Sequence, residues 1–266
     1  MTKTMTSMAE IIRVGGWGLR GLGYPYGVAE RAVPLVAWTE AAQGGAMRSL
    51  LDAEPEIAKS LTAPAIGVTV LANGVKRLDA HGRHLIEVGP PAIDLLTVEA
   101  RRGEKGDLQL VGWIGDKFVP ALGSLLGKRK LTGIMGYSAE VGEDTRWVLF
   151  SEELVTVLGS SDASPRRAES LLAATGLGGD EIERIISAHE GNRPASSYGY
   201  MTMTAWKSGA LDQGASQDNL VARVDTAWRD GFETELDDIK YLYQLETRAW
   251  APTSERSRSQ AGYGKF

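Results

Sequence analysis

The chain opens with apolar residues at helical spacing. Ser7 followed by Glu10 has the spacing of a capping box, and the apolar positions behind it recur every three or four residues. This pattern predicts a helix that begins at Ser7. A second helix is predicted over residues 25–43, with Pro34 bending or interrupting it. We therefore expect a helical region over residues 7–60.

The spacing of apolar residues along the chain changes near residue 65. Short alternating or β-branched runs separated by turn residues then predict a β-rich region over residues 65–155. The runs are AIGVTVLANGV, AIDLLTVEAR, DLQLVGWIG, LTGIMGYSAEV and TRWVLFSEE. The stretch ARRGEKGDLQL is typical of a hairpin.

Helical patterns return after residue 164. Two helices are predicted over 164–176 and 180–189, and two more over 218–229 and 234–250, while SYGYMTMTAWKSG fits a strand. The predicted fold class is α+β, with helical N- and C-terminal regions packed around a mainly antiparallel β middle. We expect a single domain over residues 1–266 whose tail, residues 251–266, is ordered.

Composition and charge exclude several classes. An apolar fraction of 43% and a charged fraction of 24% are those of an ordinary globular protein. The net charge of -5 and the lack of a large basic cluster argue against nucleic-acid and membrane partners. The absence of cysteine removes thiolate and disulfide chemistry. No apolar stretch is long enough for a signal sequence or a membrane span, so we predict a cytoplasmic, bacterial protein.

Glycine is abundant, with 32 residues. Gly16, Gly18 and Gly21 match the dinucleotide pattern G-x-G-x-x-G, and Glu40 lies at about the right distance for a ribose contact. Pro25 falls where the phosphate-binding helix should be continuous, and no βαβ unit surrounds the motif. The context favours a glycine-rich turn between helices, so we expect this stretch not to bind NAD(P) tightly.

Two of the three histidines stand together in DAHGRHLIE. His81 and His84 are candidate catalytic residues because imidazole titrates near neutrality, and Asp79 or Glu87 could orient it. The alternative is a polar surface turn, which Gly82 favours. No metal site is predicted.

The tail TRAWAPTSERSRSQAGYGKF allows two interpretations. It could be a solvated helix end followed by a frayed terminus. Alternatively, Pro252 ends the helix and the arginines fold back to hold a carboxylate or phosphate, a task suited to guanidinium groups. The candidate substrate-binding residues are Arg248, Ser254, Arg256, Arg258 and Tyr198.

Two stretches resemble known families. GLGYPYGVAERAVPLVAW and LETRAWAPTSERSRSQAGYG are similar to the two ends of an uncharacterised bacterial family of unknown function, with Trp250 in place of a tyrosine and GYG in place of GAG. That resemblance implies that the tail belongs to the folded unit. A glycine turn followed by an Ala-rich helix and then WTEAAQGG is also similar to the opening of the malate and lactate dehydrogenase family that lacks a Rossmann fold. Members of that family carry Ser-His-Gly next, where this chain has GGAMRS.

Three functions remain open from the sequence. The first is a cytoplasmic enzyme acting on a small anionic metabolite, with His81 or His84 and a tail arginine, reaction type unknown. The second is an NAD(P)-dependent 2-oxoacid or imine reductase, as the dehydrogenase resemblance implies. The third is a non-catalytic binding protein whose glycine-rich and aromatic segments form a homo-oligomer. The cofactor is unknown at this stage.

Overall fold

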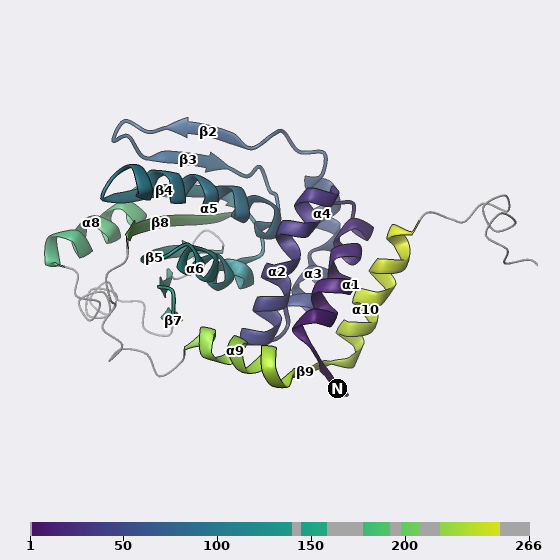
Figure 1. Cartoon of the computed structure of the whole chain (residues 1–266). Coiled ribbons are helices and arrows are strands. Elements are labelled where there is room, and N and C mark those ends of the chain that lie inside the picture. The colour runs from purple at the N-terminus through teal and green to yellow at the C-terminus, as the bar shows by residue number, and fades with distance from the viewer. Residues whose placement is uncertain (1, 140–144, 159–177, 192–197, 208–218, 251–266) are drawn as a thin grey trace, which may run out of the picture.

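The N-terminal region is mainly helical. The computed structural model describes residues 2–139, 145–158, 178–191, 198–207 and 219–250 (Figure 1). Its first helices are α1 (Met8–Gly21), α2 (Tyr26–Gln43), α3 (Ala46–Asp52) and α4 (Glu54–Ser60). The Ser7 hydroxyl accepts a hydrogen bond from the Glu10 amide at 3.1 Å, which confirms the predicted start of α1.

A seven-stranded sheet follows, in the order β2-β3-β4-β8-β5-β6-β7. Among the described pairs only β3 and β4 are parallel. The strands are β2 (Gly67–Val70), β3 (Lys76–Asp79), β4 (Lys105–Trp113), β5 (Leu131–Ser138), β6 (Arg146–Phe150), β7 (Val155–Leu158) and β8 (Gly199–Lys207). The segment SYGYMTMTAWKSG supplies β8, as predicted, and β8 pairs with both β4 and β5.

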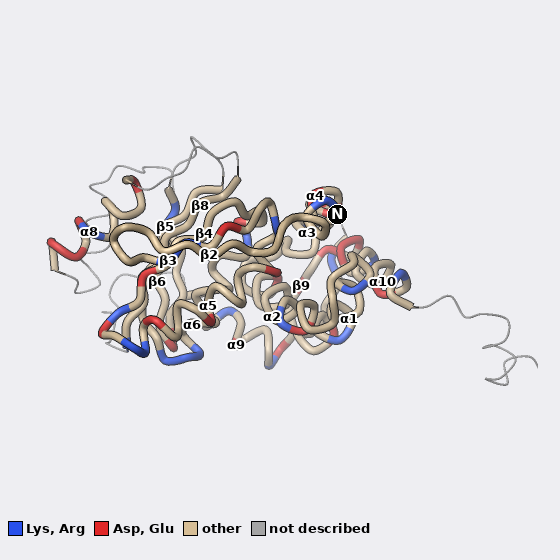
Figure 2. Tube along the Cα trace, turned by 90° about the horizontal axis from the view of Figure 1, so that it is seen from above, with Lys and Arg blue, Asp and Glu red and all other residues tan. Residues whose placement is uncertain are grey.

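Helices cover both faces of the sheet. α5 (Leu85–Arg102) and α6 (Val119–Lys128) lie side by side along one face (Figure 2), while α8 (Gly179–Glu190) packs on the other. Successive side chains of β6 point to opposite faces of the sheet. Val148 and Phe150 join the main core, whereas Trp147 and Leu149 pack with α8. The sheet is therefore the middle layer.

The C-terminal region returns to the N-terminal helices. It consists of α9 (Leu220–Asp230), β9 (Phe232–Glu235) and α10 (Leu236–Ala249). β9 pairs antiparallel with β1 (Lys3–Thr6), and α10 lies against α1 (Figure 1). The fold is α+β, with helical N- and C-terminal regions packed around a mainly antiparallel β middle, as predicted.

Two glycines of α1, Gly18 and Gly21, set the distance between α1 and α10. We call them the glycine stripe. A Cβ atom on Gly21 would lie 2.0 Å from the Leu245 carbonyl oxygen, and one on Gly18 would lie 3.2 Å from the Leu242 side chain. The two helices approach so closely that only glycine fits at Gly21. The expected turn was therefore wrong, because the G-x-G-x-x-G stretch lies inside α1 and serves as a packing face.

Two predictions in the β middle were also wrong. Residues 92–101, predicted as a strand, lie within α5, and the predicted hairpin over residues 100–110 is instead the end of α5 followed by β4. Pro90 and Pro91 weaken the helical signal in the sequence. Burial of α5 against the sheet, through residues such as Ile93 at 0% exposure, outweighs that local penalty.

Some predicted segments fall outside the described residues, namely the helix over 164–176 and the tail over 251–266. Within the part of the chain that is described, no helix is both long and apolar enough to cross a lipid bilayer.

The glycine stripe can be tested by matched substitutions in α1. Gly21→Ala should lower the free energy of unfolding by about 1–3 kcal/mol, because its methyl group collides with the backbone of α10. Gly16→Ala is the control, since a Cβ there meets no atom within 4 Å, and it should leave stability unchanged or raise it by up to about 1 kcal/mol. Urea denaturation measures both, and equal effects would contradict this packing.

Candidate functional site

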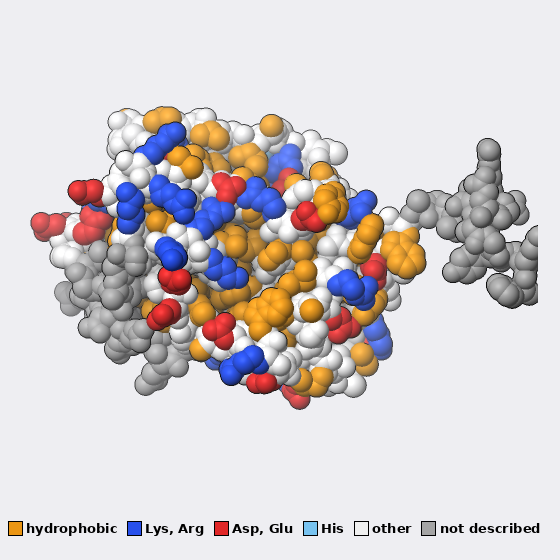
Figure 3. Space-filling view, in the orientation of Figure 1, with side chains coloured by type: hydrophobic (Ala, Val, Ile, Leu, Met, Phe, Trp, Pro, Cys, Tyr) orange, Lys and Arg blue, Asp and Glu red, His pale blue; other side chains and the backbone are white. Residues whose placement is uncertain are grey.

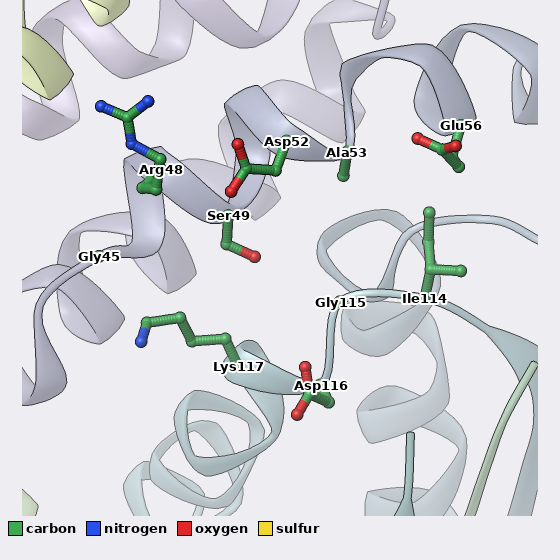
Figure 4. A pocket seen from close by; sticks show the side chains of 10 residues that line it. All are labelled: Gly45, Arg48, Ser49, Asp52, Ala53, Glu56, Ile114, Gly115, Asp116 and Lys117. Atoms are coloured by element: carbon green, nitrogen blue, oxygen red, sulfur yellow. The ribbon is translucent and has the colours of Figure 1, made fainter. Parts of the chain in front are cut away.

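A cleft opens between the N-terminal helices and the β4–α6 connection. It consists of two hollows of about 540 and 390 Å³ that share Ser49, Asp116 and Lys117. We call it the α3–α6 cleft. Figure 4 shows the first hollow, with α3 and α4 on one side and residues 114–117 on the other. The second hollow extends past Tyr137 and Arg146. Each volume falls in the range of small-molecule sites.

One wall of the cleft depends on a buried carboxylate. Glu40, at 3% exposure, accepts hydrogen bonds from the amides of Ala46 and Met47 at 2.6 and 3.2 Å. Its other oxygen accepts from the Thr234 hydroxyl at 2.6 Å. The carboxylate thus caps the start of α3 and ties it to β9. These two amides are consequently not available to bind a phosphate.

The opposite wall is the turn between β4 and α6, which contains the short 3-10 helix η1 (Asp116–Phe118). Gly115 adopts a φ of 89°, and a Cβ atom there would lie 2.4 Å from Nε2 of His84. His84 is fully buried, and its ring also packs edge-on against Phe118, with 5.2 Å between ring centroids. The imidazole therefore packs against the turn that forms this wall of the cleft.

Lys117 and Arg146 line the cleft. Lys117 reaches from η1 toward the start of α3 (Figure 4), and a Cβ on Gly45 would lie 3.4 Å from its Nζ atom. No described acidic residue lies within ion-pair distance of Lys117. Arg146 pairs with Asp116 at 3.0 Å. Arg48 instead points away from the hollow (Figure 4) and pairs with Asp238 at 2.6 Å.

The predicted histidines occupy two different environments. His81 lies in a turn with a φ of 51°, and its Nδ1 is 3.4 Å from the Asp79 carboxylate. His84 is the N-cap of α5, where Nδ1 accepts from the Ile86 amide at 3.3 Å. Burial lowers the pKa of His84 to about 3, so the ring is neutral at physiological pH. These surroundings suit a structural role for His84 better than proton transfer.

The predicted substrate-binding residues are only partly described. Tyr198 is 46% exposed and lies beside Gly82, near His81. Arg248 pairs with Glu54 of α4 at 2.5 Å, and no hydrogen bond or ion pair among the described residues joins it to either histidine. Ser254, Arg256 and Arg258 lie outside the described residues, so an anion site in the tail stays a prediction.

The sequence analysis did not identify Lys117 or Arg146 as candidates. A polar Gly-Asp-Lys turn directly after a buried strand is the local signal that could have indicated Lys117. No comparable signal marks Arg146, which reaches the cleft from a strand. Among the described residues, no three acidic or histidine side chains gather in a way that could hold a metal ion.

Comparison with known proteins shows similarity in structure only. No protein-family model and no curated protein sequence matches the chain. A dehydrogenase from Sinorhizobium meliloti shares the fold with a TM-score of 0.68 and 13% identity, over 92% of this chain and 100% of that one. Malate dehydrogenase from Pyrococcus horikoshii OT3 has a TM-score of 0.64 and 10% identity, with coverage of 94% and 97%. Delta1-piperideine-2-carboxylate reductase from Pseudomonas syringae pvar. tomato has a TM-score of 0.58 and 12% identity, with coverage of 91% and 99%.

These similarities support the predicted likeness to malate and lactate dehydrogenases at the level of the fold. The likeness to the uncharacterised bacterial family gains no support, because no family model matches.

The buried imidazole predicts a pH effect on stability. Because the pKa of folded His84 lies near 3 and that of an unfolded histidine near 6.5, the unfolded chain binds a proton first as the pH falls. Wild-type stability should therefore drop between about pH 6.5 and 3, by up to about 1.4 kcal/mol per pH unit from this group. His84→Asn keeps an N-capping acceptor but lacks this titration. The stability difference between wild type and variant should shrink as the pH falls. Urea denaturation at several pH values measures it, and a constant difference would contradict the assignment.

Proposed function

We propose that this chain is an oxidoreductase of the dehydrogenase and reductase class, which binds a small carboxylate in the α3–α6 cleft and uses a nicotinamide dinucleotide. The observation that carries the proposal is Lys117, a cation without an ion-pair partner among the described residues, placed where the two hollows meet. The fold supports it, since similar structures include proteins named for malate and for piperideine-2-carboxylate, both small carboxylates.

Arg146 is suited to hold the substrate carboxylate. A guanidinium has the planar fork geometry that matches a carboxylate, and Arg146 lines the second hollow, where it pairs with Asp116 at 3.0 Å. Arginine also stays protonated at any physiological pH, so it can bind an anion but cannot transfer a proton. Its position in the second hollow would place the carboxylate beside Lys117.

Lys117 is suited to donate the proton. Reduction of a C=O or C=N bond needs a proton at the oxygen or nitrogen atom, and an ammonium group is such a donor at neutral pH. Its Nζ atom lies near Gly45 in the first hollow, and the residue lines both hollows. The described lining of the cleft contains no histidine that could take this role.

The first hollow fits the nicotinamide riboside part of a cofactor. Asp52 and Glu56 project from α3 and α4 beside it (Figure 4) and could accept hydrogen bonds from ribose hydroxyls. A bound nicotinamide would supply the hydride. The amides at the start of α3 are taken by Glu40, and the glycine stripe packs on α10, so neither offers a phosphate cradle. This arrangement favours weak cofactor binding.

A second candidate function is carboxylate binding without catalysis. Two observations favour it: GGAMRS stands where the resembling dehydrogenases carry a histidine, and Glu40 occupies the amides of that segment. In such a protein Arg146 and Lys117 would still bind an anion. The two candidates differ in whether cofactor and turnover accompany that binding.

Replacement of Lys117 tests the proposal. The wild type should oxidise NADPH or NADH with at least one member of a panel of 2-oxo acids and cyclic imino acids. Lys117→Met should lower kcat by about 100-fold or more, because the proton donor is lost. Lys128→Met, an exposed lysine at the end of α6, is the matched control and should behave as the wild type.

Calorimetry with the same panel separates the candidates. Carboxylate binding that Lys117→Met weakens, without turnover by the wild type, would support the non-catalytic function and refute the oxidoreductase. If the wild type neither binds nor converts any of these compounds, both functions fail.

A further inference from the structure

A groove lies between α1 and α2, and it shares no described lining residue with the α3–α6 cleft. It has a volume of about 400 Å³, which falls in the range of small-molecule sites. Its lining residues recur every three or four positions along both helices, so each helix contributes one continuous face. α1 contributes Gly16, Trp17 and Arg20, and α2 contributes Tyr26, Glu30 and Val33. Figure 3 shows hydrophobic, acidic and basic side chains close together over these two helices.

Gly16 leaves part of this groove open. A Cβ atom on Gly16 would meet no atom within 4 Å, so no described neighbour requires a glycine at this position. Gly18 and Gly21 differ, because a Cβ on either would come within 3.2 or 2.0 Å of α10. A glycine inside a helix lowers stability relative to alanine. Packing therefore accounts for the glycine stripe but not for Gly16, whose missing side chain adds to the open volume of the groove.

Arg20 and Glu30 bring opposite charges to the groove. The Arg20 guanidinium lies over the rings of Trp17 and Tyr26, at 4.5 and 5.8 Å from their centroids. Glu30 accepts a hydrogen bond from the Tyr26 hydroxyl. Among the described residues, neither Arg20 nor Glu30 has an ion-pair partner, and they do not pair with each other. One cation and one carboxylate are thus available to a ligand.

The third charged residue of the described lining, Arg13, is engaged by α10. Its guanidinium lies 3.7 Å from the Glu246 carboxylate and 3.5 Å from the Tyr243 hydroxyl. A ligand that is only an anion would still face Glu30, and one that is only a cation would still face Arg20. The groove therefore suits a molecule that carries both charges.

We propose that the groove between α1 and α2 binds a free amino acid with an apolar side chain. Its carboxylate binds Arg20, whose guanidinium matches a carboxylate, and its ammonium group binds Glu30. Its side chain packs on Val33, which is 5% exposed, and on the rings of Trp17 and Tyr26, which are 42% and 61% exposed in the free protein. This site is separate from the α3–α6 cleft, so it does not depend on the proposed oxidoreductase function.

Three related ligands test this chemistry by calorimetry. L-Phenylalanine carries all three features, whereas 3-phenylpropanoate lacks the ammonium group and 2-phenylethylamine lacks the carboxylate. L-Phenylalanine should bind about tenfold more tightly than either analogue, because each analogue loses one charge-assisted contact. If L-phenylalanine does not bind at millimolar concentration, or binds no better than both analogues, the proposal is wrong.

Substitutions assign each charge to its residue. Arg20→Met should weaken L-phenylalanine and 3-phenylpropanoate by about tenfold and leave 2-phenylethylamine unchanged. Glu30→Gln should weaken L-phenylalanine and 2-phenylethylamine and leave 3-phenylpropanoate unchanged. Arg101→Met, which alters an exposed arginine at the end of α5, is the matched control and should have no effect. Lys117→Met should also leave L-phenylalanine binding unchanged, and a loss there would place the ligand in the α3–α6 cleft and refute the groove.

Gly16→Leu tests the open volume directly. The new side chain fills the groove and should abolish L-phenylalanine binding, while urea denaturation shows no loss of stability, because a Cβ there meets no neighbour. Wild-type binding by the folded Gly16→Leu variant would contradict the proposal. Analytical ultracentrifugation examines the other occupant. A wild-type dimer that Gly16→Leu converts to a monomer would assign the groove to a second copy of the chain, and the amino-acid site would be refuted.

Discussion

The buried carboxylate of Glu40 connects three parts of the chain. From inside α2 it caps α3 through the amides of Ala46 and Met47, and it also accepts the hydroxyl of Thr234 on β9. A buried charge is tolerated only when hydrogen bonds replace its hydration, and here three donors do so. The position of α3, and hence one wall of the cleft, depends on this group.

The same carboxylate limits what the cleft can bind. A helix start with free amides would attract a phosphate, but here the protein supplies its own anion. The cations of the proposed site, Lys117 and Arg146, lie instead on η1 and β6. This division favours a small carboxylate over a phosphate group seated on α3, and it accounts for the weak cofactor binding that we expect.

Two contacts fix the N-terminal helices. Glu40 holds the start of α3, and the close approach of Gly21 to the backbone of α10 sets the position of α1 against α10. Structures of the same fold share only 10–13% of their residues with this chain.

Local sequence determined most of the secondary structure and the fold class. The capping box at Ser7, the apolar periodicity of α10 and the β-branched runs of β5 and β6 act over a few residues, so they can be recognised without the fold. Tertiary structure decided the rest. Helix α5 forms despite Pro90 and Pro91 because it is buried against the sheet, and Gly21 is a packing residue because α10 lies against it. Arg146 lines the cleft together with Lys117 because the start of β6 lies close enough to η1 for Arg146 to pair with Asp116. Such contacts join residues that are far apart in the sequence, so they produce no periodic pattern of apolar residues. They form because the chain reverses direction and buries apolar surface, and not because of neighbouring residues.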